Sequence, residues 1–125
     1  MLNQTVLVGR LVREPEVKEL EDGKKVSNMT LAIPRSYKNE NGEYETDFVD
    51  CVLWNGVAQS TAEYCHQGDV LGVKGRIQTD TYETEDGTKK KVTQVIAEKI
   101  SFLSSHSKDR EESEVEKASE KELEA

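Results

Sequence analysis

The sequence has few cysteines, few prolines and no long hydrophobic run. Its 125 residues include two cysteines, two prolines and one tryptophan. No apolar stretch approaches the ~18 residues that span a bilayer, and the N-terminus lacks the basic-then-apolar pattern of a secretory signal. We therefore expect a soluble protein without a membrane segment, located in the cytoplasm.

The sequence also lacks the motifs of catalysis and of metal binding. Cys51 and Cys65 stand 14 positions apart without a second pair, which suggests neither a zinc site nor a disulfide scaffold and predicts two reduced thiols. There is no glycine-rich phosphate loop, no nucleophile elbow and no HExxH pair. His66 follows Cys65, but adjacent residues on a helix point in different directions, which is poor geometry for a dyad. We expect a binding protein with no cofactor and no metal, not an enzyme.

The acidic charge is concentrated near the C-terminus. The net charge is -8, and residues 104–125 hold eight acidic side chains against four basic ones. The first 103 residues therefore have a net charge of only -4. Phosphate contacts depend on a few local cations, whereas global charge governs solubility and long-range steering. This composition is compatible with a nucleic-acid partner.

Five segments have the hydrophobic pattern of β-strands: residues 5–12, 28–34, 44–54, 70–82 and 92–103. In the third, Val49, Cys51 and Leu53 alternate with residues of the opposite face, which indicates one buried side. Pro34 is expected to end the second strand, and residues 14–25 and 36–43 are expected to be loops. Three dipeptides favour tight turns between strands: Asp22-Gly23, Asn41-Gly42 and Asp86-Gly87.

One short helix is predicted after the third strand, with Asn55 as its N-cap and Gly68 as its stop. Its buried stripe comprises Val57, Ala58, Thr61, Ala62 and Cys65. Five strands with a single helix between the third and fourth form the arrangement of the OB-fold, a small all-β barrel. A single helix disfavours a doubly wound α/β sheet. We predict an OB-fold domain at residues 1–103 and a flexible acidic tail at residues 104–125.

Phe48 and Trp54 lie on the predicted non-core face of the third strand. At ~3.3 Å per residue they are roughly 20 Å apart, which leaves room for several nucleotides between them. Large aromatic rings on such a face gain little unless a ligand or a partner covers them. They are candidate stacking platforms for unpaired bases. The alternative is that they pack beneath a loop or in a subunit interface.

Tyr37 is predicted to lie in a polar loop between two cations. An aromatic ring beside Arg35 and Lys38 is the pattern expected where a base stacks and its phosphate is paired. The alternative for Tyr37 is a simple loop lid. Arg10 on the first strand is a further candidate for phosphate pairing, ranked above Arg13, although both also suit surface ion pairs of little energetic weight.

Tyr82 closes the fourth strand on the same parity as Lys74 and Arg76. It leads into a predicted hairpin with three consecutive lysines, of which Lys89 is the first. These side chains complete the candidate nucleic-acid-binding set. A lysine triplet at a hairpin also serves to protect a sheet edge, and this reading stays open.

Three segments together resemble bacterial and phage single-stranded DNA-binding proteins: LNQTVLVGRLVREPEV, AIPRSYKNENGEYETDFVDCVLW and GDVLGVKGRIQTDTYETEDG. The similarity spans residues 1 to about 103. It implies an OB-fold, a homotetramer and single-stranded DNA wrapped over the aromatic positions that match Tyr37, Phe48, Trp54 and Tyr82. Family members use Trp or Phe at most of these places, so the tyrosines are expected to stack somewhat less strongly.

The C-terminus departs from the family pattern. Family members usually end in an acidic Pro-Phe tip that recruits replication and repair proteins, whereas this chain ends KELEA. Recruitment through that tip is therefore in doubt. Besides sequence-tolerant binding of single-stranded DNA in replication, recombination and repair, two alternatives stay open. One is a protein-protein adaptor with aromatic anchors, and the other is an RNA-binding module of the cold-shock type.

Overall fold

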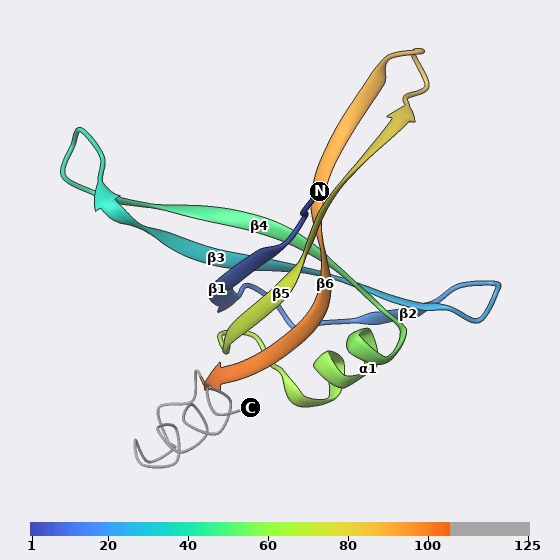
Figure 1. Ribbon diagram of the computed structural model, residues 1–125, viewed down its shortest axis with the longest axis horizontal. Helices are drawn as coiled ribbons and strands as arrows, with labels where there is room; N and C mark the ends of the chain where they lie inside the picture. The colour runs from blue at the N-terminus through green and yellow to red at the C-terminus, as the bar shows by residue number, and fades with distance from the viewer. Residues whose placement is uncertain (106–125) are drawn as a thin grey trace.

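A computed structural model describes residues 1–105 as a β-barrel from which three hairpins project (Figure 1). Its elements are β1 (Thr5–Leu11), β2 (Val17–Glu19), β3 (Lys25–Lys38), β4 (Tyr44–Trp54), α1 (Asn55–Tyr64), β5 (Val70–Glu83) and β6 (Lys89–Ser104). The strands form one sheet in the order β1-β5-β6-β4-β3-β2. The barrel closes where β1 also pairs with β3, with Arg10 opposite Ala32 and Leu11 opposite Leu31.

The hydrophobic core is built from alternate residues of the strands and from one face of the helix. Met29 and Leu31 of β3 and Cys51 and Leu53 of β4 are buried, as the period-2 pattern predicts. The other members of the core include Leu11, Ala58, Cys65, Leu71, Val73, Val95 and Ala97. The predicted OB-fold is confirmed: its five strands correspond to β1, β3, β4, β5 and β6, with α1 between β4 and β5.

Two segments differ from the expectation for loops. Residues 17–19 form β2, which pairs with the start of β3. β3 continues past Pro34 to Lys38, and its register with β4 shifts between these two residues. Beyond Ile33, β4 is the only described strand that pairs with β3. The missing N–H of Pro34 therefore interrupts no second ladder of hydrogen bonds among the described strands. A proline in an arm of two strands therefore does not end the strand.

The predicted tight turns are confirmed at the tips of the three hairpins. Gly23, Gly42 and Gly87 have φ of 86°, 77° and 84°, a region that favours glycine. In the β3–β4 turn, the Asn39 side-chain oxygen accepts hydrogen bonds from the backbone N–H of Asn41 and Glu43, each at 2.9 Å. Such bonds fix the turns and hold the arms as regular hairpins.

Cys51 and Cys65 are both buried, and no disulfide joins them. Burial, followed by the nearby Asp50 carboxylate, raises the pKa of Cys51 to about 11. Within residues 1–105 no helix has the length and apolar character needed to cross a membrane. Apart from Ser104 and Ser105, the predicted tail lies outside the described residues.

Candidate nucleic-acid interface

One continuous surface carries most of the predicted binding residues. We call it the outer face: the side of β3, β4, β6 and β5 turned away from the core. Residues directly opposite in neighbouring strands point to the same side of a sheet. The pairs that define the outer face are Ala32–Phe48, Val26–Trp54, Val52–Ile96, Ile96–Arg76 and Lys90–Tyr82.

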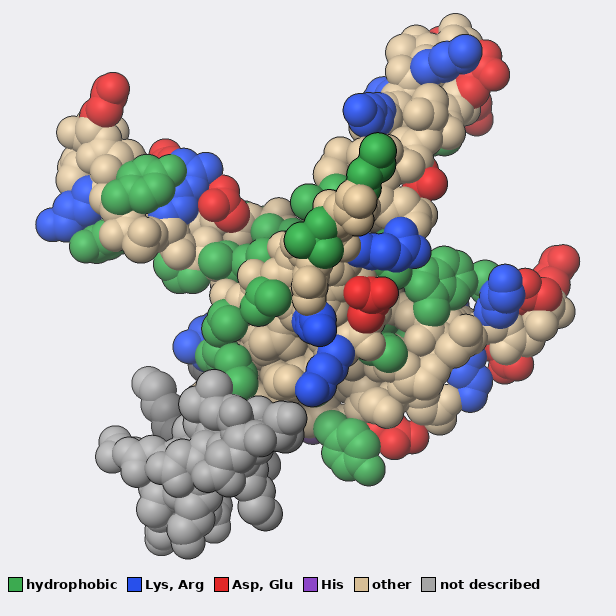
Figure 2. All heavy atoms as spheres, viewed as in Figure 1, with side chains coloured by type: hydrophobic (Ala, Val, Ile, Leu, Met, Phe, Trp, Pro, Cys, Tyr) green, Lys and Arg blue, Asp and Glu red, His purple; other side chains and the backbone are tan. Residues whose placement is uncertain are grey.

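The aromatic rings predicted to stack bases lie outside the core. The exposed fractions are 66% for Phe48, 38% for Trp54, 51% for Tyr82 and 63% for Tyr37. The register places Phe48, Trp54 and Tyr82 on the outer face. Hydrophobic side chains are visible along the front of the barrel and on the β3–β4 arm at the left (Figure 2). Flat apolar groups thus remain accessible where a ligand would cover them.

Phe48 stands in a row that also contains a cation. Its cross-strand neighbour on β3 is Ala32, whose small side chain leaves the ring uncovered. The next residue in the row, on β1, is Arg10. Two strand spacings of ~4.8 Å separate Arg10 from Phe48, a span that suits a stacked base and its phosphate. The Arg10 guanidinium donates a 2.6 Å hydrogen bond to the carbonyl oxygen of Gly68, which fixes the direction of its side chain.

Trp54 is positioned by the abrupt change from β4 to α1. The following residue, Asn55, has a positive φ of 50°, and its side-chain oxygen accepts a 3.1 Å hydrogen bond from the Lys25 N–H. The prediction of Asn55 as N-cap is wrong: Trp54 occupies that position without a side-chain cap. Asn55 tolerates the left-handed conformation that the sharp turn requires. Its side-chain oxygen accepts the hydrogen bond from β3 instead of capping the helix. The helix also ends at Tyr64, before the predicted stop at Gly68.

Tyr37 and Lys38 lie on β3 in the projecting arm, not in a loop as predicted. Lys38 stands opposite Tyr44, and its ammonium nitrogen is 5.8 Å from the centroid of that ring, within cation–π range. Tyr44 is exposed and was not among the predicted site residues. Tyr44 lies an even number of positions from Phe48 and Trp54 on the same strand. This spacing places the three rings on one face and could have identified Tyr44. The arm thus carries two exposed rings, Tyr37 and Tyr44.

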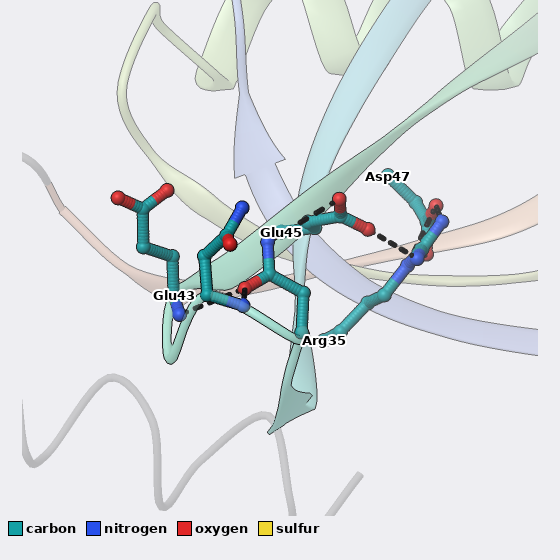
Figure 3. A network of polar contacts seen from close by, with 6 residues as sticks. Arg35, Glu43, Glu45 and Asp47 are labelled. Carbon is teal, nitrogen blue, oxygen red and sulfur yellow. Dashed lines mark hydrogen bonds and ion pairs between the residues drawn. The ribbon is translucent and has the colours of Figure 1, made fainter.

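Arg35 is already paired with two carboxylates at the root of the same arm (Figure 3). Its Nη1 lies 2.6 Å from Glu45 Oε2, and its Nη2 lies 2.8 Å from Asp47 Oδ1. Hydrogen bonding and charge from Asp47 raise the pKa of Arg35, and the guanidinium in turn lowers the pKa of Asp47. A phosphate approaching Arg35 would therefore compete with two anions. We call these three residues the arginine clamp.

Neutralising the carboxylates of the arginine clamp is expected to strengthen binding of single-stranded nucleic acid. In Glu45→Gln/Asp47→Asn the freed guanidinium gains one phosphate contact, which steepens the slope of log K against log salt by about 0.7. Adding Arg35→Gln to that double variant should abolish the change. If the steeper slope persists in the triple variant, the gain comes from the lost negative charge and not from Arg35. Fluorescence titration at several salt concentrations measures both slopes.

The remaining predicted cations are divided between the barrel and the β5–β6 arm. Lys74 lies on β5 opposite Val6 of β1, and Arg76 donates a 2.8 Å hydrogen bond to the Gln78 side chain. Lys89 lies on the arm opposite Glu83. Basic side chains gather near the tip of this arm together with acidic ones (Figure 2). Lys74 and Lys89 have no ion-pair partner within residues 1–105.

These features define the class of protein. A five-stranded barrel with one helix between β4 and β5 is the OB architecture, and OB-folds bind oligonucleotides and oligosaccharides on the sheet face and its flanking loops. Exposed rings on that face can stack on the bases of a single strand. In a duplex the bases are already stacked on one another, so such rings are a poorer match for its grooves. The single-strand binding protein family matches residues 2–103, and the chain belongs to this family.

Curated bacterial relatives agree with this assignment. The chain is 47% identical to the single-stranded DNA-binding protein B of Bacillus subtilis over 103 residues, which cover 82% of this chain and 91% of that protein. It is 47% identical to the single-stranded DNA-binding protein of Halalkalibacterium halodurans over 103 residues, but covers only 61% of its length. For the corresponding protein of Lactiplantibacillus plantarum the identity is 44%, and the covered share is 52%. The family is one of binding proteins, not enzymes.

Proposed function

We propose that this protein binds single-stranded DNA without sequence preference and coats and protects it during replication, recombination and repair. The observation that carries the proposal is the placement of Phe48, Trp54 and Tyr82 on the outer face, exposed and beside cations. Family membership and the printed names of the relatives support the choice of substrate.

Stacking on the exposed rings would supply most of the affinity. Base-aromatic stacking contributes ~1 to 3 kcal/mol per base, so the rings of Tyr37, Phe48, Trp54 and Tyr82 together contribute roughly 4 to 12 kcal/mol before ordering costs. Every base has a π-face, so this binding does not depend on sequence. The cations assigned to phosphate pairing are Arg10, Arg35, Lys38, Lys74, Arg76 and Lys89. Of these, Arg35 contributes least while it is paired with Glu45 and Asp47.

The single tryptophan gives a direct test of this function. Oligo-dT at micromolar concentration and low salt is expected to quench Trp54 fluorescence, because a base stacks on its ring. Duplex DNA of the same length should leave the emission unchanged. A weaker response to oligo-rU separates this function from an RNA-binding module, and unchanged emission with every oligomer would refute nucleic-acid binding at Trp54.

Self-association as a homotetramer is part of the proposal. Residues 5–9 of β1 pair with β5 along one edge and with no described strand along the other. Val6 and Val8, on the outer side of this strand, are each more than half exposed. An unpaired edge with exposed valines favours association with a second copy.

We expect light scattering to give the mass of four 14.1 kDa chains. Val6→Glu/Val8→Glu is expected to lower that mass, because it places charges on the associating strand. Val12→Glu, a substitution of an exposed valine outside β1, serves as a matched control. A wild-type mass of one chain would refute self-association.

The proposed location is the cytoplasm, in association with the nucleoid, where bacterial unpaired DNA occurs. The domain proposed at residues 1–103 is followed by a segment with eight acidic and four basic side chains. Recruitment of replication and repair proteins through residues 104–125 is open to a direct test. Equal capture of such proteins with and without residues 104–125 would exclude any recruiting role of the tail.

A further inference from the structure

A hollow of about 400 Å³ lies beside the outer face, at the end marked by Trp54. It is lined by Arg13, Glu14, Glu16, Lys18, Val26 and Asn28. The volume is within the ~300 to 1,000 Å³ typical of ligand pockets, and the lining is mostly polar. None of these residues belongs to the binding set assigned above.

The strand register connects this hollow to the outer face. Lys18 of β2 stands opposite Val26 of β3, and Val26 stands opposite Trp54 of β4. Directly opposite residues share one side of a sheet, so these three side chains form one row on the outer face. Two strand spacings of ~4.8 Å separate Lys18 from Trp54. A strand of DNA that leaves the Trp54 ring toward β2 therefore enters the hollow.

Two basic side chains of the hollow are available to a phosphate. Arg13 and Lys18 make no ion pair or side-chain hydrogen bond with residues 1–105, whereas Lys24 on the same hairpin faces Asp22. Both carboxylate oxygens of Glu14 are engaged: Oε1 accepts a 2.9 Å bond from the Gln67 N–H, and Oε2 lies 3.2 Å from His66 Nδ1. This contact fixes the wall of the hollow to the loop before β5. The contacts with Gln67 and His66 lower the pKa of Glu14, so it stays anionic and the hollow holds two carboxylates, Glu14 and Glu16. Because both oxygens of Glu14 are engaged elsewhere, Arg13 and Lys18 stay unpaired within residues 1–105 and are available to a phosphate.

We propose that the hollow binds the nucleotide next to the one stacked on Trp54, with Lys18 and Arg13 pairing its phosphate and the flanking one. The proposal rests on the proposed function, because its ligand is the same single-stranded DNA. The Asn28 amide, on the outer face next to Val26, offers a donor and an acceptor to the base edge. The apolar side of Val26 contacts the sugar or the base. The binding path thereby extends one step beyond the aromatic rings.

The salt dependence of oligo-dT binding tests this assignment. Lys18→Gln/Arg13→Gln removes two phosphate contacts and is expected to reduce the slope of log K against log salt by about 1.4. If the plots of log K against log salt for the wild type and the double variant meet at 1 M salt, the smaller slope corresponds to about 25-fold weaker binding at 0.1 M salt. Lys24→Gln, with half that charge change on the same hairpin, should alter the slope little. If Lys24→Gln changes the slope by half as much as the double variant does, the effect depends on charge alone. That result would overturn the proposal.

Chemical modification of the wild-type protein provides the second measurement. Bound oligo-dT is expected to protect the Lys18 amine from an amine-reactive reagent by several-fold, while Lys24 keeps its reactivity. Equal reactivity of Lys18 with and without oligo-dT would overturn the proposal. Trp54 quenching in the same samples reports the proposed function separately, so quenching without Lys18 protection refutes only the hollow. Absent quenching would refute nucleic-acid binding at Trp54, on which the proposed function rests.

Discussion

Phe48→Ala/Trp54→Ala is expected to weaken binding of oligo-dT by roughly 30- to 25,000-fold. Each ring contributes ~1 to 3 kcal/mol of stacking, and the two sites are far enough apart for their effects to add. Because both rings are exposed on the outer face, their removal leaves no core cavity. Each single variant is expected to lose about 5- to 150-fold. Since the double variant lacks tryptophan, a labelled oligo-dT and fluorescence anisotropy measure all the affinities at constant salt.

The matched control for these variants is Tyr64→Ala. Tyr64 ends α1 and is more exposed than Phe48, but it lies on the helix and not on the outer face. Its removal should change the affinity by less than about twofold. An equal loss in Tyr64→Ala would indicate a non-specific effect. Wild-type affinity in the double variant, with an unchanged unfolding midpoint, would refute stacking on the outer face.

The parity of the strands made the stacking positions predictable from the sequence. In β4, Cys51 and Leu53 enter the core, so Phe48 and Trp54 necessarily point outward. This argument needs only the period of two along one strand. It does not tell which residues of other strands lie beside each ring. The row Arg10–Ala32–Phe48 and the row Lys18–Val26–Trp54 both depend on the register between strands, which the sequence pattern does not specify.

Local rules failed where tertiary contacts replaced local ones. Pro34 was expected to end a strand, but β3 continues there, paired among the described strands with β4 alone. Asn55 was expected to cap α1, but its side chain binds the Lys25 N–H, 30 positions away along the chain. Arg35 was interpreted as a cation that pairs a phosphate beside Tyr37, but it is paired with carboxylates of the facing strand. Each partner lies on another strand, so local patterns around these residues could not identify it.

Gly75→Ala is expected to destabilise the barrel by about 3 kcal/mol or more. A Cβ at this position would lie 2.1 Å from the carbonyl oxygen of Ile96 and 3.1 Å from the Cα of Ala97. Both obstructing atoms belong to the backbone of β6, and no side-chain rotation relieves the contact. Since β6 also pairs with β4 at Ile96 and Ala97, moving it away from β5 disturbs the parallel ladder as well. Gly75 lies between Lys74 and Arg76, so the cations beside the outer face would shift too.

Thermal unfolding at a fixed protein concentration measures this effect. For a domain of this size ~3 kcal/mol lowers Tm by roughly 12 to 24 °C. Gly72→Ala is the matched control on the same strand, because the nearest atom to its added Cβ is the Leu103 side chain at 3.6 Å, an ordinary van der Waals distance. That variant should unfold within a few degrees of the wild type, since a strand alanine also loses less backbone entropy than glycine on folding. Equal Tm values for the two variants would mean that β5 and β6 separate at Gly75 at little cost. The close approach of the two backbones would then not be what makes glycine necessary at this position.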